Sequence, residues 1–445
     1  MAVIHRRNFL QSSGKAAVAM TAASYSRIQG ANDRLQVACI GVRGRGRSHI
    51  KQFSDRQETE VAAVVDIDQS VAERAAQYTV QLQGRKPAEY EDLRKMLEDK
   101  SIDIVTIATT NHWHALATIW ACQAGKDVYV EKPASHNIFE GRKMVEAARK
   151  YMRIVQVGHQ SRSVTHKLRA VKLLREGIIG KIYMARGLCY KRRETIGVRK
   201  PSPIPPGINY DLWLGPSQEI DFKKNRFHYN WHWYWHFGNG DIGNQGVHEM
   251  DIARWGLGID ELPSSVYSSG GHFLYPDDQQ TPNTQQAIFD YDDAQLVFEV
   301  RGLLTGSEAG LRPVSPGGHN VIGNIFFGSK GYMTVDLYGF KTFLGEKHQP
   351  GPSMETVEKF HRDEDTKAHI ENFLKAVQSR KLEDLNCDIE VGHRSAALCH
   401  MANISYRVGR KLLFDNKSET FPGDHEANKM LTRKYREPFV VPDKV

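Results

Sequence analysis

Lys132 is the residue whose position most strongly indicates chemistry. A short apolar run, residues 127–130, precedes Glu131, Lys132 and Pro133. Pro133 removes a backbone donor and biases the preceding residue toward an extended conformation, so we expect Lys132 at the tip of a strand. Ligands of open parallel sheets bind at this carboxyl edge. A surface lysine that merely ends a strand is the alternative, and the neighbouring motifs favour a site.

A glycine-rich turn follows the first predicted strand, residues 35–40, and leads into a helical stretch. Glycines let the backbone approach a pyrophosphate, while the N-terminus of the helix supplies amide donors. The pattern departs from the usual dinucleotide fingerprint, because Arg43 stands where the second glycine is expected. The turn residues that we expect to contact a cofactor are Gly41, Arg43, Gly44, Arg45 and Gly46.

Asp66 ends the predicted strand at residues 61–65, where an acid accepts hydrogen bonds from an adenosine ribose. Such an acid repels a 2′-phosphate, so this position favours NAD over NADP, although Arg43 and Arg45 leave NADP open. An incidental Asp66 beside a helix cap at Asp68 is the simpler interpretation, but it requires two coincidences. Strand, glycine turn and acid in this order predict dinucleotide binding.

The segment at residues 109–114 follows another predicted strand and therefore lies on the same edge of the sheet. We expect this segment to flank the cofactor. Its two histidines could also bind a metal, but no carboxylate or cysteine accompanies them at ligand spacing, so we predict no metal site. The further residues expected to contact the cofactor are Thr109, Asn111, His112, His114, Glu131, Lys132 and Gln160.

Asn244 and His248 are predicted to complete the reaction site with Lys132. If residues 240–258 form one helix, Asn244 and His248 lie one turn apart on one face and can both reach a substrate. Oxidising an alcohol requires a proton acceptor, and burial beside a positively charged nicotinamide lowers the pKa of a lysine toward that role. We therefore predict Lys132 as the base and His248 as a proton relay or hydroxyl-orienting group. Asn244 either orients a hydroxyl or merely caps the helix.

Residues 228–236 combine three tryptophans with histidines at positions 228, 232 and 236. Either a helix or a strand places these histidines on roughly one side. A zinc site is one interpretation, but the interleaved tryptophans suit stacking against sugar rings, and we favour a substrate pocket. Core packing accounts for some of the aromatic residues. The predicted substrate contacts are Trp213, Trp231, His232, Trp233, His236 and Asp241.

The elements that position these residues change in character near residue 158. Short apolar strands alternate with amphipathic helical stretches over residues 34–157, which predicts a doubly wound α/β domain whose parallel sheet is covered on both faces. Residues 158–445 are predicted to form an α+β domain around an antiparallel or mixed sheet. The predicted strands of this domain are 182–191, 284–291 and 294–301, and its predicted helices are 368–380 and 391–413.

Composition excludes several classes of protein. With 445 residues, 40% of them hydrophobic, the chain can bury a large core and divide into domains. The formal charge is +8, but no block of basic residues is interleaved with aromatics, which argues against a nucleic-acid partner. The five cysteines lie far apart, so we expect buried free thiols and neither a disulfide framework nor a zinc knuckle.

Residues 1–33 have the features of a twin-arginine export signal. Arg6 and Arg7 precede a weakly apolar stretch that ends in small residues. An ordinary first helix is the alternative, which the short, Ser- and Gly-punctuated run disfavours. We expect no membrane span after this leader. The sequence therefore predicts a periplasmic or otherwise exported protein.

Several motifs, taken in order, resemble the glucose-fructose oxidoreductase and inositol dehydrogenase (Gfo/Idh/MocA) family. They are the glycine turn, Asp66, residues 109–114, the Glu-Lys-Pro motif at 131–133 and residues 246–251. The similarity covers nearly the whole chain after the leader, and Glu-Lys-Pro is its most specific short motif. It implies a Rossmann domain, a second domain on a large open, mostly antiparallel sheet, a nicotinamide cofactor, a sugar-like or cyclitol substrate and a homodimer or homotetramer. It also implies that the lysine and the histidine act near the reacting carbon.

The chain departs from these relatives at Asn244. Dehydrogenases of the family commonly carry an aspartate one turn before the histidine, whereas an amide can orient a hydroxyl but cannot share its proton. The departure leaves room for altered chemistry. The leader, together with residues 210–216 and 393–396, resembles an exported branch of the family.

Three functional hypotheses follow. The first is an exported NAD-dependent oxidoreductase that moves a hydride between a sugar, glycoside or cyclitol carbon and a tightly bound nicotinamide. The second is a redox-neutral enzyme that cleaves or epimerises a glycoside after transient oxidation acidifies a neighbouring carbon–hydrogen bond. The third is a sugar- or nucleotide-binding protein without turnover, because a fold alone never establishes catalysis.

Overall fold

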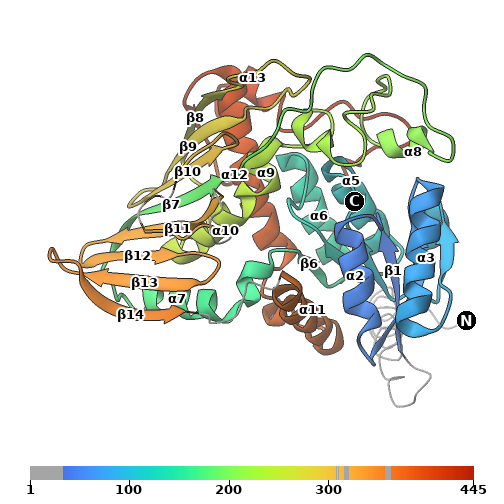
Figure 1. Cartoon of the computed structure of the whole chain (residues 1–445), viewed down its shortest axis with the longest axis horizontal. Coiled ribbons are helices and arrows are strands. Elements are labelled where there is room, and N and C mark those ends of the chain that lie inside the picture. The colour runs from blue at the N-terminus through green and yellow to red at the C-terminus, as the bar shows by residue number, and fades with distance from the viewer. Residues whose placement is uncertain (1–33, 307, 309, 315–319, 356–361) are drawn as a thin grey trace, which may run out of the picture.

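Two sheets organise the chain, a six-stranded sheet near the N-terminus and a nine-stranded sheet that follows it (Figure 1). The structure is a computed structural model that describes residues 34–306, 308, 310–314, 320–355 and 362–445. The predicted export signal at residues 1–33 therefore lies outside the described residues.

The first sheet is entirely parallel, with the strand order β3-β2-β1-β4-β5-β6. The order changes direction between β1 and β4, and sheets of this kind bind ligands outside the strand ends at such a point. This confirms the predicted doubly wound fold. The strands are β1 (Leu35–Ile40), β2 (Thr59–Val65), β3 (Ala88–Tyr90), β4 (Ile104–Ile107), β5 (Asp127–Val130) and β6 (Val155–Val157). The helices are α2 (Arg45–Ser54), α3 (Gln69–Gln83), α4 (Leu93–Leu97), α5 (Asn111–Gln123) and α6 (Ile138–Lys150).

Helices cover both faces of this sheet because its strands are apolar on both sides. Val37 and Cys39 of β1 pack with α2 and α3, whereas Ala38 and Ile40 of the same strand pack with α4, α5 and α6. Strands β4 and β5 are buried along their whole length. Such continuous apolar strands are typical of parallel sheets with two covered faces.

Lys132 lies between β5 and α6 and belongs to neither element. The helix begins only after Asn137, whose side-chain oxygen accepts a hydrogen bond from the backbone N–H of Glu140 at 2.9 Å. This cap satisfies one of the amide groups left without partners at the start of a helix. The strand therefore ends at the predicted place, and the lysine stands at its tip.

The second sheet has the order β14-β13-β12-β11-β7-β10-β9-β8-β15. Its neighbouring strands are antiparallel except for the parallel pair β7 and β10. The mostly antiparallel α+β part of the expected fold is confirmed. The strands are β7 (Ile182–Tyr190), β8 (Ser265–Gly271), β9 (Thr284–Asp290), β10 (Gln295–Arg301), β11 (Val321–Gly328), β12 (Gly331–Val335), β13 (Gly339–Leu344), β14 (Gln349–Glu355) and β15 (Leu412–Leu413).

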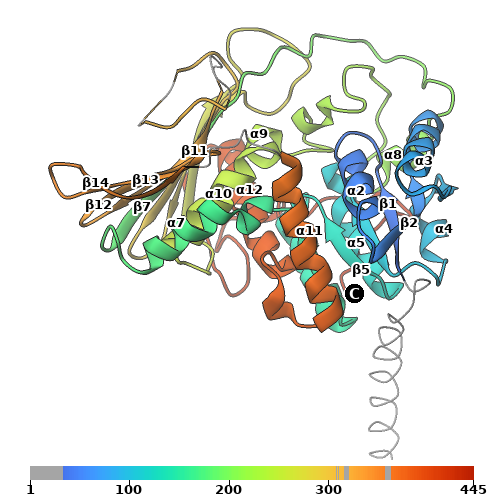
Figure 2. The same ribbon diagram turned by 60° about the horizontal axis from the view of Figure 1, so that its bottom comes forward.

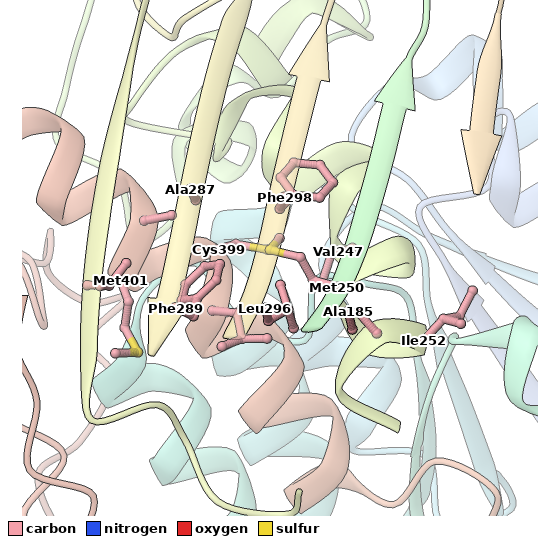
Figure 3. Packing of buried hydrophobic residues seen from close by; sticks show 14 of the residues in the cluster. Ala185, Val247, Met250, Ile252, Ala287, Phe289, Leu296, Phe298, Cys399 and Met401 are labelled. Atoms are coloured by element: carbon pink, nitrogen blue, oxygen red, sulfur yellow. The ribbon is translucent and has the colours of Figure 1, made fainter. Parts of the chain in front are cut away.

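Helices pack against one face of the second sheet, as Figure 2 shows. The core between them holds Met250 of α10 and Met401 of α12 against Phe289 and Phe298 of the strands (Figure 3). The helices of this part are α7 (Thr165–Arg175), α8 (Tyr210–Leu214), α9 (Gly240–Asn244), α10 (Gly246–Leu257), α11 (Arg362–Ser379), α12 (Ile389–Val408) and α13 (His425–Asn428). Three 3-10 helices are η1 (Gln160–Ser163), η2 (Asn230–Trp233) and η3 (Leu382–Asp384).

Two predicted helices differ from the structure, one at its end and one in its interior. The helix predicted at residues 391–413 ends at Val408, because Gly409 takes a left-handed conformation with φ of 71°. Glycine adopts this conformation without steric cost and commonly ends helices. The stretch predicted as one helix over residues 240–258 is divided into α9 and α10, with Gln245 between them.

Helix α11 completes the core of the first sheet although it comes late in the chain. Its residues Ile370, Phe373 and Val377 pack in one buried cluster with Val37 and Cys39 of β1. Helix α12 contributes Ala396 to the core of the first sheet and Ala397 to that of the second, so the two sheets are joined by shared packing as well as by the chain. Over the described residues, none of the helices combines the length and apolar character needed to cross a bilayer. All five cysteines are buried and free.

Candidate functional site

A cavity of about 840 Å³ extends from the carboxyl edge of the first sheet to helix α10. Gly41, Gly44 and Asp66 line one end of this cavity, and Lys132 and His248 line the other. The cavity therefore brings the predicted cofactor residues and the predicted reaction residues into one space.

The glycine turn is close-packed against the next strand. A Cβ atom on Gly41, where φ is 75°, would lie 2.8 Å from the carbonyl oxygen of Ala108. A Cβ atom on Gly46 would lie 1.9 Å from the carbonyl oxygen of Gly41. Gly46 does not line the cavity, and it therefore shapes the turn from outside. Helix α2 begins directly after Gly44 without a side-chain cap. The N–H of Gly46 donates to the carbonyl of Arg43 at 2.8 Å, and no side chain caps the other amides of this first turn, which can therefore bind an anion.

Asp66 stands at the end of β2 and lines the cavity. One carboxylate oxygen accepts a hydrogen bond from the backbone N–H of Val42 at 3.0 Å, and the other accepts one from the N–H of Asp68 at 3.1 Å. Burial raises the pKa of Asp66 to about 6, and the two amides oppose this shift. The group is thus ionised at neutral pH and keeps lone pairs for ribose hydroxyls.

Arg45 and Glu131 line the cavity but bind each other. The Nε of Arg45 donates to Oε1 of Glu131 at 2.7 Å, and the side chains of His49 and Gln160 approach the same oxygen at 3.1 and 3.2 Å. Burial opposes ionisation of Glu131, but the Arg45 guanidinium and His49 hold its pKa well below the usual range. Arg43 and Arg45 are the two arginines that left NADP possible in the sequence analysis. The charge of Arg45 is balanced by Glu131.

The loop at residues 109–114 divides between the cavity and the core. Thr109, Asn111 and His114 line the cavity, and the Nδ1 of His114 lies 2.7 Å from the carbonyl oxygen of Pro133. His112 does not line it. Its ring is fully buried, with Nε2 at 3.1 Å from the carbonyl oxygen of Trp213. The structure thus gives His112 a packing position instead of the cofactor contact predicted from its place in the loop.

The break between α9 and α10 explains how Lys132 is held. The backbone N–H of His248 bonds the carbonyl of Gln245, so the carbonyl of Asn244 has no partner within the helix. That carbonyl accepts a hydrogen bond from Nζ of Lys132 at 2.5 Å. The side-chain amide of Asn244 lies 3.4 Å from a carboxylate oxygen of Asp241. Asn244 and His248 both line the cavity, but not as neighbouring turns of one helix.

Burial dominates the protonation of both reaction residues. It lowers the pKa of Lys132 to about 8, while Glu131 opposes this shift and Lys191 adds to it. His248 is also buried, and its pKa is well below the usual range, with the Lys132 charge as a further cause. Its ring meets that of His159 edge to face at 5.4 Å between centroids. At neutral pH His248 is therefore an uncharged hydrogen-bonding group.

The segment at residues 228–236 is a series of turns around η2 and not a regular helix or strand. Trp231 and His232 line the cavity together with Trp213. The rings of Trp231 and His232 stack with their centroids 3.6 Å apart. His236 points elsewhere and lines a separate cavity. The predicted common face of the histidines is wrong, because irregular turns do not preserve a four-residue spacing.

Two other predicted substrate residues lie outside the cavity lining. Asp241 is paired with Arg193 through bonds of 2.6 and 2.9 Å, so its carboxylate is not free for sugar hydroxyls. Trp233 is buried in an aromatic cluster, with the same guanidinium 5.2 Å from its ring centroid. Core packing accounts for Trp233.

Sequence reasoning missed several charged or polar lining residues, among them Lys167, Lys191, Gln245 and Glu249. Lys191 follows β7 directly, so its place at the end of a predicted strand was a usable signal. Gln245 and Glu249 adjoin Asn244 and His248 in sequence, but only the helix break shows that they reach the cavity. Nothing in its helical surroundings distinguishes Lys167. Across the described chain, no group of three or more His, Cys, Asp or Glu side chains is arranged to hold a metal ion.

Family models match most of the chain. The model described as an oxidoreductase family with an NAD-binding Rossmann fold matches residues 35–159. The model described as the C-terminal alpha/beta domain of that oxidoreductase family matches residues 169–297 and 348–441. Together these matches cover the whole first sheet and, in the second sheet, strands β7, β8, β9, β14 and β15.

Curated relatives match a shorter part of the chain. A glycosyl hydrolase family 109 protein of Shewanella baltica is 30% identical over 203 residues, which are 40% of this chain and 44% of that protein. An alpha-N-acetylgalactosaminidase of Shewanella oneidensis is 28% identical over 203 residues, which again are 40% of this chain and 44% of that protein. The match thus spans less than half the length of these curated relatives.

Solved structures share the fold over most of the chain. A levoglucosan dehydrogenase in complex with NADH and levoglucosan has a TM-score of 0.65 and 17% identity, covering 85% of this chain and 99% of that one. An NAD binding oxidoreductase from Klebsiella pneumoniae has a TM-score of 0.64 and 20% identity, covering 86% and 99%. At these identities the likeness establishes the fold alone.

Proposed function

The chain belongs to the Gfo/Idh/MocA oxidoreductase family, and from that premise we propose that it moves a hydride between a carbon of a sugar, glycoside or cyclitol and a bound nicotinamide. One observation carries the proposal: a single cavity contacts Gly41 and Asp66 at one end and Lys132 and His248 at the other. A nucleotide seated on the glycine turn would direct its reactive ring toward the lysine.

The first end of the cavity fits NAD. The turn at Gly41 has no space for a side chain, so backbone amides can approach a pyrophosphate closely. Asp66 has spare lone pairs for the two ribose hydroxyls, and Thr109, Asn111 and Gln160 are placed to flank the rest of the molecule. When bound, the nicotinamide serves as hydride acceptor or donor.

At the second end Lys132 acts as the general base. Its pKa of about 8 leaves a sizeable neutral fraction near neutral pH, and the free amine accepts the proton of a substrate hydroxyl. The Asn244 carbonyl fixes the position of Nζ by accepting one of its hydrogens. Neutral His248 orients the hydroxyl by a hydrogen bond. Such general base catalysis contributes about 10²- to 10⁴-fold to a rate.

A redox-neutral reaction is the second candidate function. It is supported by Asn244, which supplies an amide where the family's dehydrogenases commonly carry a carboxylate, and by the similarity to proteins named as glycosyl hydrolases. Transient oxidation at one carbon would acidify the neighbouring C–H bond, and the hydride would return to the sugar. Cleavage of a chromogenic glycoside without net NADH would establish this reaction, whereas net NADH with a free sugar establishes the first.

Gentle purification followed by mass spectrometry of the released small molecules tests the proposal. We expect NAD or NADH at near one equivalent per chain, and reduction of the nucleotide by sugars or cyclitols. Recovery of no nucleotide, together with no binding of added NAD, would contradict it. Nucleotide binding without turnover of sugars, glycosides or cyclitols would instead support a binding protein.

Export and assembly complete the proposal. The twin-arginine leader would carry the folded protein with its cofactor loaded, and a periplasm offers little free NAD, so the cofactor is tightly held and recycled within one cycle. We also propose a homodimer or homotetramer formed through the open face of the nine-stranded sheet, where Tyr183, Tyr267 and Ile288 are exposed. Cell fractionation tests the export, and light scattering tests the assembly.

A further inference from the structure

A second cavity, of about 290 Å³, lies between α12, the C-terminal tail and the turn at residues 235–239, and we call it the basic cavity. Four cationic side chains line it, and no Asp or Glu of the described chain does so. The cationic residues are Arg407, Lys429, Arg433 and Lys434. Three histidines also line the basic cavity, at positions 136, 236 and 400. The positive charge of the basic cavity is therefore not balanced by carboxylates of its lining, whereas acidic and basic side chains both line the larger cavity.

Arg433 is the innermost cation of the basic cavity. One of its terminal nitrogens donates to the carbonyl oxygen of His236 at 3.0 Å and lies 3.3 Å from Nδ1 of His136. It makes no ion pair with a carboxylate of the described chain. The carboxylate whose charge favours the protonated form of Arg433 is Glu140, and burial raises the pKa of Glu140 to about 7, so this counter-charge is incomplete at neutral pH. A largely buried, unpaired guanidinium is costly unless a counter-ion joins it.

His136 has a hydrogen-bond donor without an acceptor. Burial and the Arg433 charge hold the pKa of His136 well below its usual range, so the ring is neutral. Since Nδ1 faces a guanidinium donor, the remaining hydrogen belongs on Nε2. Within the described residues Nε2 reaches no partner in hydrogen-bond geometry, although the Gly238 carbonyl favours a proton on the ring. Among the described residues, Nε2 of His136 thus has no acceptor in hydrogen-bond geometry.

We propose that the basic cavity binds a multiply charged oxyanion, a phosphate or sulfate group either free or carried on a sugar. Its oxygens accept hydrogen bonds from the guanidinium of Arg433, with Arg407 and the two lysines completing the positive surroundings. Charge-assisted bonds between guanidinium groups and such oxyanions are among the strongest that proteins form.

The bound group would connect the tail to the turn that serves the larger cavity. The same segment places Trp231 and His232 in the larger cavity and Trp235 and His236 in the basic cavity. Arg433 already joins the tail to this turn through the His236 carbonyl. An anion that binds both Arg433 and Arg407 therefore holds residues 235 and 236 in place from the basic cavity, while residues 231 and 232 of the same segment face the larger cavity.

Calorimetric titration of the full chain with inorganic phosphate, sulfate and a hexose phosphate tests this proposal, with chloride at matched ionic strength as the reference. We expect one site per chain, and a rise in Tm that saturates with phosphate or sulfate. Arg433→Gln and Arg407→Gln each weaken the binding about tenfold or more. Tighter binding of the hexose phosphate would identify a sugar substituent as the source of the oxyanion.

Lys417→Gln is the matched control, because it removes an exposed cation outside both cavities. It leaves oxyanion binding unchanged. If Arg433→Gln does not fold, Arg407→Gln decides the test, since that side chain is exposed. Absence of binding by all three oxyanions, or binding that neither arginine substitution weakens, would overturn the proposal. These measurements require no turnover, so their outcome is independent of the oxidoreductase assignment.

Discussion

At Lys132, opposing influences set the protonation of one ammonium group. Burial favours the neutral amine, and the neighbouring charges of Lys191 and Arg45 act in the same direction, whereas Glu131 favours the ammonium. The result is a pKa of about 8. Because Arg45 neutralises Glu131 through a bond of 2.7 Å, the carboxylate adjoining Lys132 has much of its charge balanced. The pair thereby helps to keep the lysine usable as a base.

The rate of substrate oxidation is expected to rise with pH and level off above about 8, the pKa of Lys132. The sign follows from the role of the group, since only the neutral amine accepts a proton and its fraction grows as pH rises through the pKa. A profile of kcat/KM from pH 6 to 10 measures this, in buffers of constant ionic strength. A profile that is flat or falls across this window would remove Lys132 as the base.

Lys132→Met should lower turnover about 10²- to 10⁴-fold while nucleotide affinity changes little, because the substitution removes the base and leaves Asp66 and the glycine turn intact. Steady-state kinetics and fluorescence titration with NADH separate the two effects. Lys172→Met, an exposed lysine of α7 outside the cavity, is the control and should behave as the wild type. Unchanged turnover of the Lys132 variant would contradict the mechanism.

Asn244→Asp is predicted to shift the pH profile upward by roughly one unit or more, because a carboxylate beside Lys132 favours its ammonium form. The backbone carbonyl that accepts the Lys132 hydrogen bond is retained in this variant. If Asn244 is also what directs the enzyme toward a redox-neutral reaction, net NADH formation should increase. An unshifted profile would show that the side chain at 244 lies too far from Nζ to act on its charge.

At the scale of elements, the glycine turn shows what a parallel sheet requires at its ligand-binding edge. Gly41 combines a left-handed backbone with a close approach to the Ala108 carbonyl, whereas Gly84, at the end of α3, has the same φ of 75° and open space around it. The two positions therefore differ in the approach of the neighbouring strand and not in backbone conformation.

Gly41→Ala is expected to lose both stability and NAD affinity, whereas Gly84→Ala loses stability alone. Both substitutions cost roughly 1–2 kcal/mol of stability, because both place a Cβ on a left-handed residue. At Gly41 the Cβ also displaces the Ala108 backbone, so NAD affinity should fall about tenfold or more, a difference of about 1.4 kcal/mol in binding. Urea unfolding and NAD titration of both variants measure the two quantities. Equal NAD affinity in the two variants would contradict the role of the turn.

Elements were more predictable from the sequence than the contacts between them. The strand, glycine turn and Asp66 follow one local pattern, so the sequence alone locates the cofactor end of the cavity. The break at Gln245 was not predicted, because helical periodicity continues across it and the freed carbonyl of Asn244 is used by Lys132, which is distant in sequence. For the same reason the position of His236 was missed, since irregular turns have no periodicity to read.

At the scale of the whole molecule, the C-terminal part of the chain belongs to both halves. Helix α11 packs on the face of the first sheet beside α2, although nothing in its own sequence predicts that it packs against this sheet. A division at residue 158 therefore describes the order of the chain better than it describes the packing. Long-range packing of this kind depends on shape complementarity, which hydrophobic patterns alone do not specify.

Phe373→Ala should destabilise the protein and also weaken NAD binding, because Phe373 of α11 is buried in the core of the first sheet, with its ring against Tyr129 of β5. Phe421→Ala is the matched control, since that ring is equally buried but lies in the core of the second sheet. Each loses about 3–5 kcal/mol of stability. Only the first should raise the Kd for NAD, measured well below either Tm. Equal Kd values would show that α11 does not support the nucleotide site.

A crystal structure of the protein with bound NAD tests the central claim most directly. The account predicts the pyrophosphate on the turn at Gly41, the adenosine ribose at Asp66, and the nicotinamide ring in the cavity beside Lys132 and His248. The contradicting result would be a nucleotide bound elsewhere, or a nicotinamide ring separated from the Lys132 amine by protein.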